Sequence, residues 1–347
     1  MAKQQTPSKA LSSILEDIPA VDINTARGVG KKLIDGGSVM IDELIGLVGQ
    51  TFGDPAGAMG KYAMHGAAIY AGRAGAEGDR KMVCEALAGQ LSKKHSIDLK
   101  AFIIRQLQFC GRSDELPALA KFLGDKQLCE PAVQAMLAIG GDSAAGGLRG
   151  ALAGAKGKHR VTILNAVGRL RDKGSAPAVR KFAGDKDRDV RLAALYALGN
   201  IGDAESADVL LAAADGEESY ERTQATDACF LLARRLAEGG DTKNSAKICR
   251  ALSAARKTPA DVHDRCAALA VLAETCGVEA VGDVMEAMDS EDVKVRHPAA
   301  RAAVKLAGVI AKKHSAEANK LLKKALKATK DRVVIQGAEL LLAGSGK

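Results

Sequence analysis

An arginine recurs along the second half of this chain, and its spacing is the feature that most constrains the fold. Successive arginines are 31, 31, 43, 31 and 36 residues apart. They are Arg160, Arg191, Arg222, Arg265, Arg296 and Arg332. A sequence pattern that recurs about every 30 residues is typical of repeat proteins. In these proteins small structural units are stacked, and each unit buries an apolar face against its neighbour. The spacing therefore predicts a repeat array rather than one compact globule.

The residues three, seven and ten places after each arginine predict an amphipathic helix in every unit. These positions share one face of a helix with about 3.6 residues per turn. Sixteen of the eighteen residues are apolar, in a chain that is 47% hydrophobic overall. Four units also carry an acid four places before the arginine, where a carboxylate can cap a helix start. These acids are Asp187, Glu218, Asp261 and Asp292.

A second, shorter helix is expected after a turn in each unit. The turn is rich in glycine, aspartate or serine, as in residues 199–206, and the helix that follows is exemplified by residues 207–214. In the 43-residue unit the second helix is expected to extend through residues 242–257. Pro298 should bend its helix or delay the start of that helix.

Residues 185–219, DKDRDVRLAALYALGNIGDAESADVLLAAADGEES, resemble the short HEAT-like repeat associated with phycobilin lyases and with many bacterial scaffold proteins. The resemblance covers roughly residues 54–347. It implies an all-α fold, a right-handed α-solenoid of about eight antiparallel helix pairs. It also implies ion-pair ladders between repeats, with Asp187 beside Arg191 and Asp292 beside Arg296. The full set assigned to this structural ladder is Arg160, Asp187, Arg191, Arg222, Arg265, Asp292, Arg296 and Arg332.

Residues 1–53 lack the arginine register and are predicted to form an N-terminal helical cap on the solenoid of residues 54–347. Residues 38–49 are expected to be the helix that covers the first full repeat. The segment GVGKKL, with Gly28 and Gly30, is expected to be a turn between cap helices. Its alternative is the hairpin of helix-hairpin-helix modules, which grips DNA phosphates. A Walker-type phosphate loop is excluded, because that motif needs four residues between its glycines and a Ser or Thr after the lysine.

The positive charge is concentrated at the C-terminal end of the sequence. Residues 294–347 contain thirteen Lys or Arg and three acids, a net charge of +10, whereas the whole chain carries +8. A basic C-terminal helix pair is therefore predicted, with an apolar stripe on one helix face and a lysine stripe on another. The apolar stripe is Leu321, Leu322, Ala325 and Leu326. The candidate site for a polyanion or a partner is Lys320, Lys323, Lys324, Lys327 and Lys330.

Two interpretations of this lysine stripe are weighed against each other. Lysines on one helix face can neutralise phosphates and release counterions, as nucleic-acid binding requires. Alternatively, they form the solvated outer face of a terminal repeat. The sequence has no Trp and no aromatic residue after Phe230, which argues against stacking on bases and against a membrane-surface helix with aromatic anchors.

The sequence predicts no catalytic residue, no cofactor and no metal site. None of the six histidines is followed by Glu, as the di-iron hydroxylase with HEAT repeats would need, and no G-x-S-x-G, H-E-x-x-H or dinucleotide fingerprint is present. The seven cysteines have no C-x-x-C spacing, and His263 with Cys266 is too small a set for zinc. No run of residues is long enough to span a membrane and no secretory leader is apparent, so a cytoplasmic location is predicted.

These observations predict a non-catalytic scaffold or adaptor that binds a protein partner through its concave face and its basic C-terminal end. Two alternatives stay open. The chain could be a nucleic-acid-associated binding protein that uses the lysine stripe. It could also be a subunit of a lyase or of another modifying enzyme, since the relatives share a repeat rather than a portable catalytic motif.

Overall fold

The structure, a computed structural model, describes residues 6–54, 57–256, 258 and 261–344. All regular secondary structure in these residues is helical. The chain divides into two compact units, Met1–Leu170 and Arg171–Lys347, called unit 1 and unit 2. The all-α prediction is confirmed.

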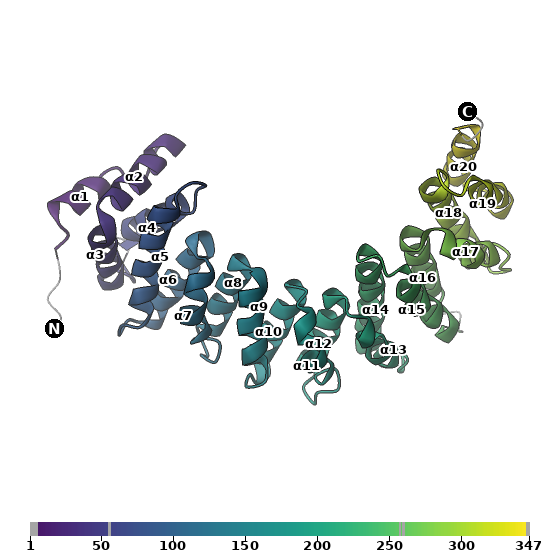
Figure 1. Cartoon of the computed structure of the whole chain (residues 1–347), viewed down its shortest axis with the longest axis horizontal. Helices are drawn as coiled ribbons and strands as arrows, with labels where there is room; N and C mark the ends of the chain where they lie inside the picture. The colour runs from purple at the N-terminus through teal and green to yellow at the C-terminus, as the bar shows by residue number, and fades with distance from the viewer. Residues whose placement is uncertain (1–5, 55–56, 257, 259–260, 345–347) are drawn as a thin grey trace. The chain divides into compact units, whose positions relative to one another are not determined.

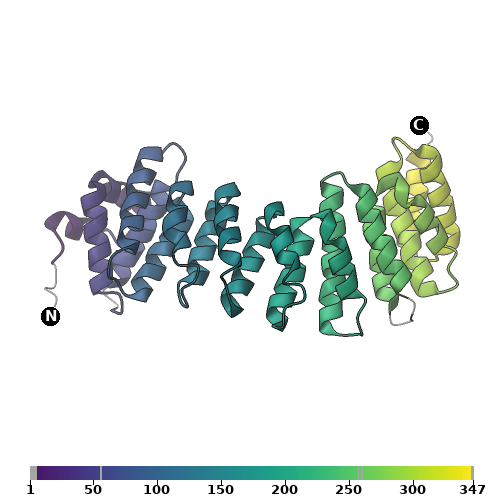
Figure 2. The same ribbon diagram turned by 60° about the horizontal axis from the view of Figure 1, so that its bottom comes forward.

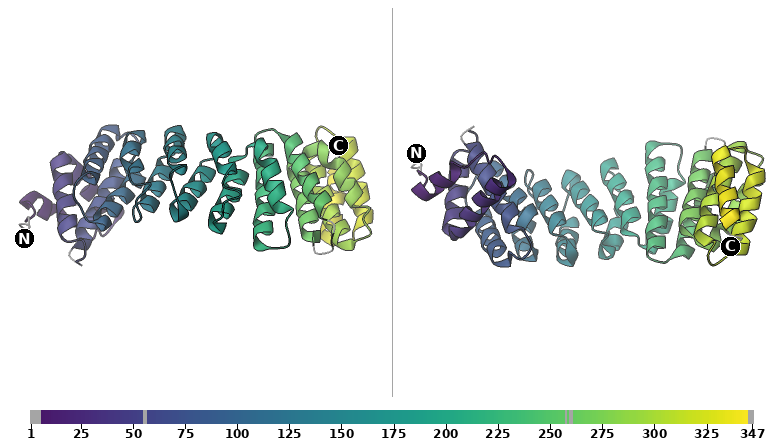
Figure 3. Two further views of the ribbon diagram at one scale, coloured as in Figure 1. Left: turned by 90° about the horizontal axis from the view of Figure 1, so that it is seen from below. Right: turned by 90° about the horizontal axis from the view of Figure 1, so that it is seen from above.

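Unit 1 consists of two layers of helices (Figures 1 and 3). Each helix of the first layer packs against the next one in that layer: α2 (Ile23–Asp35), α4 (Gly57–Ala71), α6 (Ile97–Cys110), α8 (Cys129–Ile139) and α10 (Gly157–Arg169). The second layer contains α3 (Gly37–Gln50), α5 (Glu77–Leu91), α7 (Leu116–Ala120) and α9 (Gly141–Leu152). The short helix α1 (Lys9–Leu15) packs on α2 and α4. Helices α2 and α3 thus continue the same two layers.

Unit 2 repeats this arrangement, and its longer helices run side by side in Figure 2. Its first layer contains α12 (Arg188–Ile201), α14 (Tyr220–Glu238), α16 (Val262–Thr275), α18 (Val293–Ile310) and α20 (Arg332–Gly344). Its second layer contains α11 (Ala176–Arg180), α13 (Ala207–Ala214), α15 (Thr242–Ala255), α17 (Val281–Ala287) and α19 (Ser315–Ala328). Short 3-10 turns lead into α11, α13 and α17.

The predicted arginine register marks the first layer. Each of the six arginines lies in the first turn of α10, α12, α14, α16, α18 or α20. The residues three places later in the first five of these helices are fully buried: Ile163, Ala194, Ala225, Ala268 and Ala299. Small residues let the helices approach closely, and a Cβ added to Gly199 in α12 would lie 2.6 Å from the Ala228 carbonyl oxygen in α14. The predicted second helices at residues 207–214 and 242–257 are α13 and α15, and residue 257 lies outside the described residues.

The predicted acidic caps hold for two of the four helices. The Asp187 carboxylate accepts a hydrogen bond from the Asp189 backbone N–H at the start of α12, and Asp292 does the same for Lys294 at the start of α18. At α14 the prediction is wrong, because the cap is the Ser219 hydroxyl rather than Glu218. Asp261 precedes α16 and makes no side-chain cap. Its carboxylate binds elsewhere, as described below.

The predicted turn at Gly28 and Gly30 is wrong, because both residues lie inside α2. The Asp22 carboxylate caps this helix through the Asn24 and Thr25 backbone N–H groups, each at 2.8 Å. The chain turns later, where α3 begins at Gly37, whose φ is +68°. Since the segment is helical, the helix-hairpin-helix interpretation is also removed.

Pro298 does not delay its helix, because α18 begins at Val293 and runs through the proline. A proline inside a helix leaves the carbonyl four residues earlier without its usual N–H partner. Here that carbonyl belongs to Lys294, and the Cys266 thiol of α16 donates to it at 3.3 Å. The neighbouring helix thus satisfies the group that the proline leaves open.

Candidate functional site

The lysine stripe lies mainly on one helix, α19. Leu321, Leu322 and Ala325 are buried against the rest of unit 2. On another face of the helix, Lys320, Lys323 and Lys327 are exposed. We call these three residues the α19 lysine face. Lys330 follows the helix and is also exposed.

Lys324, the fifth predicted lysine, has a different environment. Its ammonium group donates to the Asp289 carboxylate at 2.5 Å, and only 24% of the side chain is exposed. Asp289 follows α17, which packs beside α19, so this ion pair joins two second-layer helices. The structure therefore separates Lys324 from the other four lysines.

Three of the six predicted ladder arginines bridge to acids of the next repeat. The Arg191 guanidinium donates to both carboxylate oxygens of Glu221 in α14, at 3.1 and 2.7 Å. Arg222 donates to Asp261 at the start of the following repeat, and Arg265 lies 3.9 Å from Asp292. Arg160 and Arg332 stand at the starts of α10 and α20. The ion pairs run from one repeat to the next rather than along a single helix.

A second set of hydrogen bonds explains why an arginine recurs at this position. Arg191 donates to the carbonyl oxygens of the residues six and five places before it, at 2.8 and 3.1 Å. Arg296 makes the same two contacts in its own repeat, at 2.7 and 3.1 Å. A guanidinium has several donors in a fixed planar arrangement, so it can bind a loop backbone and a neighbouring acid together. The arginine therefore fixes the loop that precedes each of these helices.

Asp261 links its own loop to the preceding repeat. Its carboxylate accepts from the Thr258 hydroxyl at 2.8 Å, from the Thr258 backbone N–H at 3.1 Å and from Arg222. These bonds, led by that of the Thr258 hydroxyl, lower the pKa of Asp261 from its ordinary value of 3.8 to about 2. The folded state therefore favours the ionised form of the Asp261 carboxyl group.

We expect Asp261→Asn to change how stability depends on pH. Because the pKa is lowered on folding, the carboxylate stabilises the fold above its unfolded pKa, and this contribution disappears as the pH falls toward about 2. Near neutral pH the variant should lose roughly 1 to 2 kcal/mol of unfolding free energy. Urea unfolding between neutral pH and pH about 2 measures this. A difference between wild type and variant that stays constant over that range would contradict the assignment.

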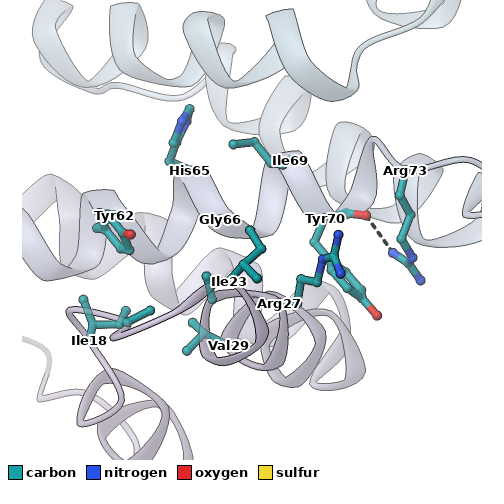
Figure 4. A pocket seen from close by; sticks show the side chains of 12 residues that line it. Ile18, Ile23, Arg27, Val29, Tyr62, His65, Gly66, Ile69, Tyr70 and Arg73 are labelled. Atoms are coloured by element: carbon teal, nitrogen blue, oxygen red, sulfur yellow. Dashed lines mark hydrogen bonds between the residues drawn. The ribbon is translucent and has the colours of Figure 1, made fainter.

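An apolar groove lies between α2 and α4 in unit 1 (Figure 4). We call it the α4 groove. Its volume is about 560 Å³. Ile23 and Val29 line it on the α2 side, and Tyr62, Gly66 and Ile69 line it on the α4 side. The sequence analysis missed it, because its walls come from segments about forty residues apart that show no shared motif.

The described residues contain no cluster of three or more His, Cys, Asp or Glu side chains that could hold a metal ion. None of the helices in the same residues has the length and apolar character that a bilayer crossing needs.

Comparison with known proteins identifies the repeats. Residues 145–229 match the family model for HEAT repeats, across α9 to α14. This segment consists of HEAT repeats. This confirms the resemblance seen in the sequence, and the shared register of the arginines extends the same pattern to α20. No curated protein matches the sequence.

Solved structures of karyopherins share the fold of this chain. A mutant of Kap121p matches 99% of this chain with a TM-score of 0.54 and 10% identity, over 44% of its own length. Kap95p, the yeast importin-beta, in a structure concerned with its binding to RanGDP, matches 96% with a TM-score of 0.52 and 11% identity, over 50% of its length. The chain thus spans half of these proteins or less, and the likeness concerns the solenoid fold alone.

Human deoxyhypusine hydroxylase also matches, with 18% identity over 67% of this chain and 96% of its own length. The TM-score is 0.31, so this match carries no argument about fold or activity.

Proposed function

We propose that this protein is a non-catalytic scaffold that binds an acidic segment of a protein partner through the α19 lysine face. The supporting observation is that Lys320, Lys323 and Lys327 are exposed together, while Lys324 is the member of the stripe that pairs with an acid of the chain. Over these residues the helix rises by about 10 Å, which suits several carboxylates of one peptide. Exposed charges of this kind guide a partner of opposite sign.

The surroundings of the lysine face favour a protein over nucleic acid. Helix α17 packs beside α19 and carries the exposed acid Glu286, and Asp289 follows it. A duplex backbone presents uniform negative charge and prefers a continuous positive surface, whereas a protein partner can match a surface of mixed sign. Binding through a concave face, as the sequence analysis expects, stays a part of this proposal.

The test is a triple charge reversal, Lys320→Glu, Lys323→Glu and Lys327→Glu. Each exposed ion pair contributes up to about 1 kcal/mol, so we expect binding of a fluorescent peptide of about ten glutamates to weaken at least tenfold at low salt. Fluorescence anisotropy measures the change. The three side chains are exposed, so the fold should tolerate the reversal.

The matched control reverses three exposed lysines of unit 1, Lys93, Lys94 and Lys126, with the same change in net charge. It should change peptide binding less than twofold. A random-sequence DNA duplex is the second probe. Tighter binding of the duplex than of the peptide, lost in the α19 variant, would replace the proposal by the nucleic-acid alternative. If neither probe binds at low salt, the proposal is wrong.

A further inference from the structure

The α4 groove follows one face of α4 for about two helical turns and continues just past the end of the helix. Tyr62, Gly66 and Ile69 line it at positions i, i+4 and i+7, and Arg73 lines it beyond the end of α4. At about 1.5 Å per residue the helical part of this face is about 10 Å long. The opposite wall comes from α2, which packs closely along α4. The groove therefore has room along α4 for a helix of about two turns.

The rim of the groove is open. Ile23, Tyr62 and Ile69 are 66%, 51% and 52% exposed. The apolar surface continues onto α6, where Phe109 is 47% exposed and its ring lies 4.8 Å from that of His65. A site for a small apolar ligand buries about 70–90% of that ligand, which walls this open do not achieve. A continuous exposed apolar surface is instead typical of a contact with a protein.

One end of the groove is positive. Arg27 and Arg73 lie there, at the end away from Ile18 and Tyr62 (Figure 4). Arg73 donates to Asp79 at 2.6 Å and to the Tyr70 carbonyl oxygen at 2.7 Å. Arg27 is exposed, and in the described part of the chain it makes neither an ion pair nor a hydrogen bond. None of the residues that line the groove is acidic.

On the α4 side, the middle of the groove has no side chain, because it is formed by Gly66. A Cβ added to Gly66 would meet no atom within 4 Å. The opening above Gly66 can therefore accept an apolar side chain from a partner, between Tyr62 on one side and Ile69 on the other.

We propose that the α4 groove binds an amphipathic helix of a partner protein. Apolar side chains at i, i+3 or i+4, and i+7 of that helix fill the groove, and a carboxylate at one end of the helix pairs with Arg27. Helices that bind in grooves use this spacing of anchors. The site is separate from the α19 lysine face, so either proposal can fail without the other.

The experiment selects peptides of about 20 residues from a random phage-displayed library on the full chain, a length that allows about three helical turns. Enriched peptides should share the apolar spacing and an acid one turn beyond it. Gly66→Leu blocks the groove and should weaken their binding at least tenfold. Since glycine disfavours a helix, this variant should fold at least as well as wild type.

Gly89→Leu is the matched control. Gly89 is an exposed glycine inside α5 of the same unit, and a Cβ there also meets nothing within 4 Å. It should leave peptide binding unchanged.

A second variant tests the charged end of the groove. When the library is selected on Arg27→Glu, the charge at the end of the enriched peptides should change from acidic to basic.

Three outcomes would overturn the proposal. The library could yield no shared spacing, the peptides could bind Gly66→Leu as tightly as wild type, or Arg27→Glu could leave the selected charge unchanged. A titration with palmitate tests whether the groove binds a lipid acid instead of a helix. Binding of palmitate that Gly66→Leu abolishes, with no enriched peptide, would assign the groove to a lipid acid and reject the helix.

Discussion

Arg256→Met is expected to destabilise unit 2 by about 3 kcal/mol, because it removes a buried charge that holds four helices together. Arg256 is 3% exposed and follows α15. Its guanidinium donates to Asp264 of α16 at 2.7 Å, to the Thr226 hydroxyl of α14 at 2.8 Å and to the Ala214 carbonyl of α13 at 2.8 Å. Methionine keeps the apolar stem and removes every donor.

The expected cost comes mainly from the groups that lose their partner. The Ala214 carbonyl and the Thr226 hydroxyl lie at a buried contact, where an unsatisfied acceptor costs about 1 to 3 kcal/mol. The Asp264 carboxylate is 34% exposed, so water can partly replace the guanidinium there. For this reason the expected loss lies at the low end of the range for a broken buried ion pair.

Arg250→Met, inside α15 and six residues before Arg256, is the matched control. Arg250 binds Asp283 through two donors, but its side chain is 49% exposed. An exposed pair contributes at most about 1 kcal/mol. Because a repeat array can unfold in parts, hydrogen exchange of the amides in α14 to α16 should accompany urea unfolding. If Arg250→Met and Arg256→Met lost the same unfolding free energy, burial would not be the reason why Arg256 stabilises unit 2.

The first-layer helices could be predicted because their signal is local and repeated. An arginine and the apolar residues at three, seven and ten places after it fall within one helix, and the structure begins α12 and α18 at the same point relative to Arg191 and Arg296. The same local reasoning did not show that α18 could begin before Pro298, because the Cys266 thiol that satisfies the Lys294 carbonyl comes from another repeat. Local patterns predict helices, but they do not show which neighbour supplies a missing partner.

The candidate sites depend on contacts that the sequence does not reveal. The lysine stripe was visible as a spacing, yet its division into a paired Lys324 and an exposed face depends on Asp289, 35 residues away. The α4 groove gave no signal at all, because Tyr62 and Ile69 resemble ordinary core residues of a helix. Only the position of α2 leaves them half-exposed at the rim of a groove.

Gly30→Leu is expected to destabilise unit 1 by about 2 kcal/mol, because the glycine marks a close approach of two helices rather than a turn. A Cβ at Gly30 would lie 2.8 Å from the Tyr70 Cβ and 3.2 Å from the Gly66 carbonyl oxygen, both in α4. These are backbone or near-backbone atoms, so a larger side chain can be accommodated only if α2 moves away from α4. Urea unfolding, together with hydrogen exchange of α2 and α4, measures the loss.

Gly28→Leu provides the control two residues earlier in the same helix. A Cβ there meets nothing within 4 Å. Leucine is the better helix former, so this variant should equal wild type or gain up to about 1 kcal/mol. We therefore expect the change in unfolding free energy to have opposite signs at the two positions. Both glycines lose the same backbone entropy on folding, but only Gly30 faces α4. If the two variants lost stability equally, the segment would need a glycine for its backbone conformation, and the helical packing described here would be wrong.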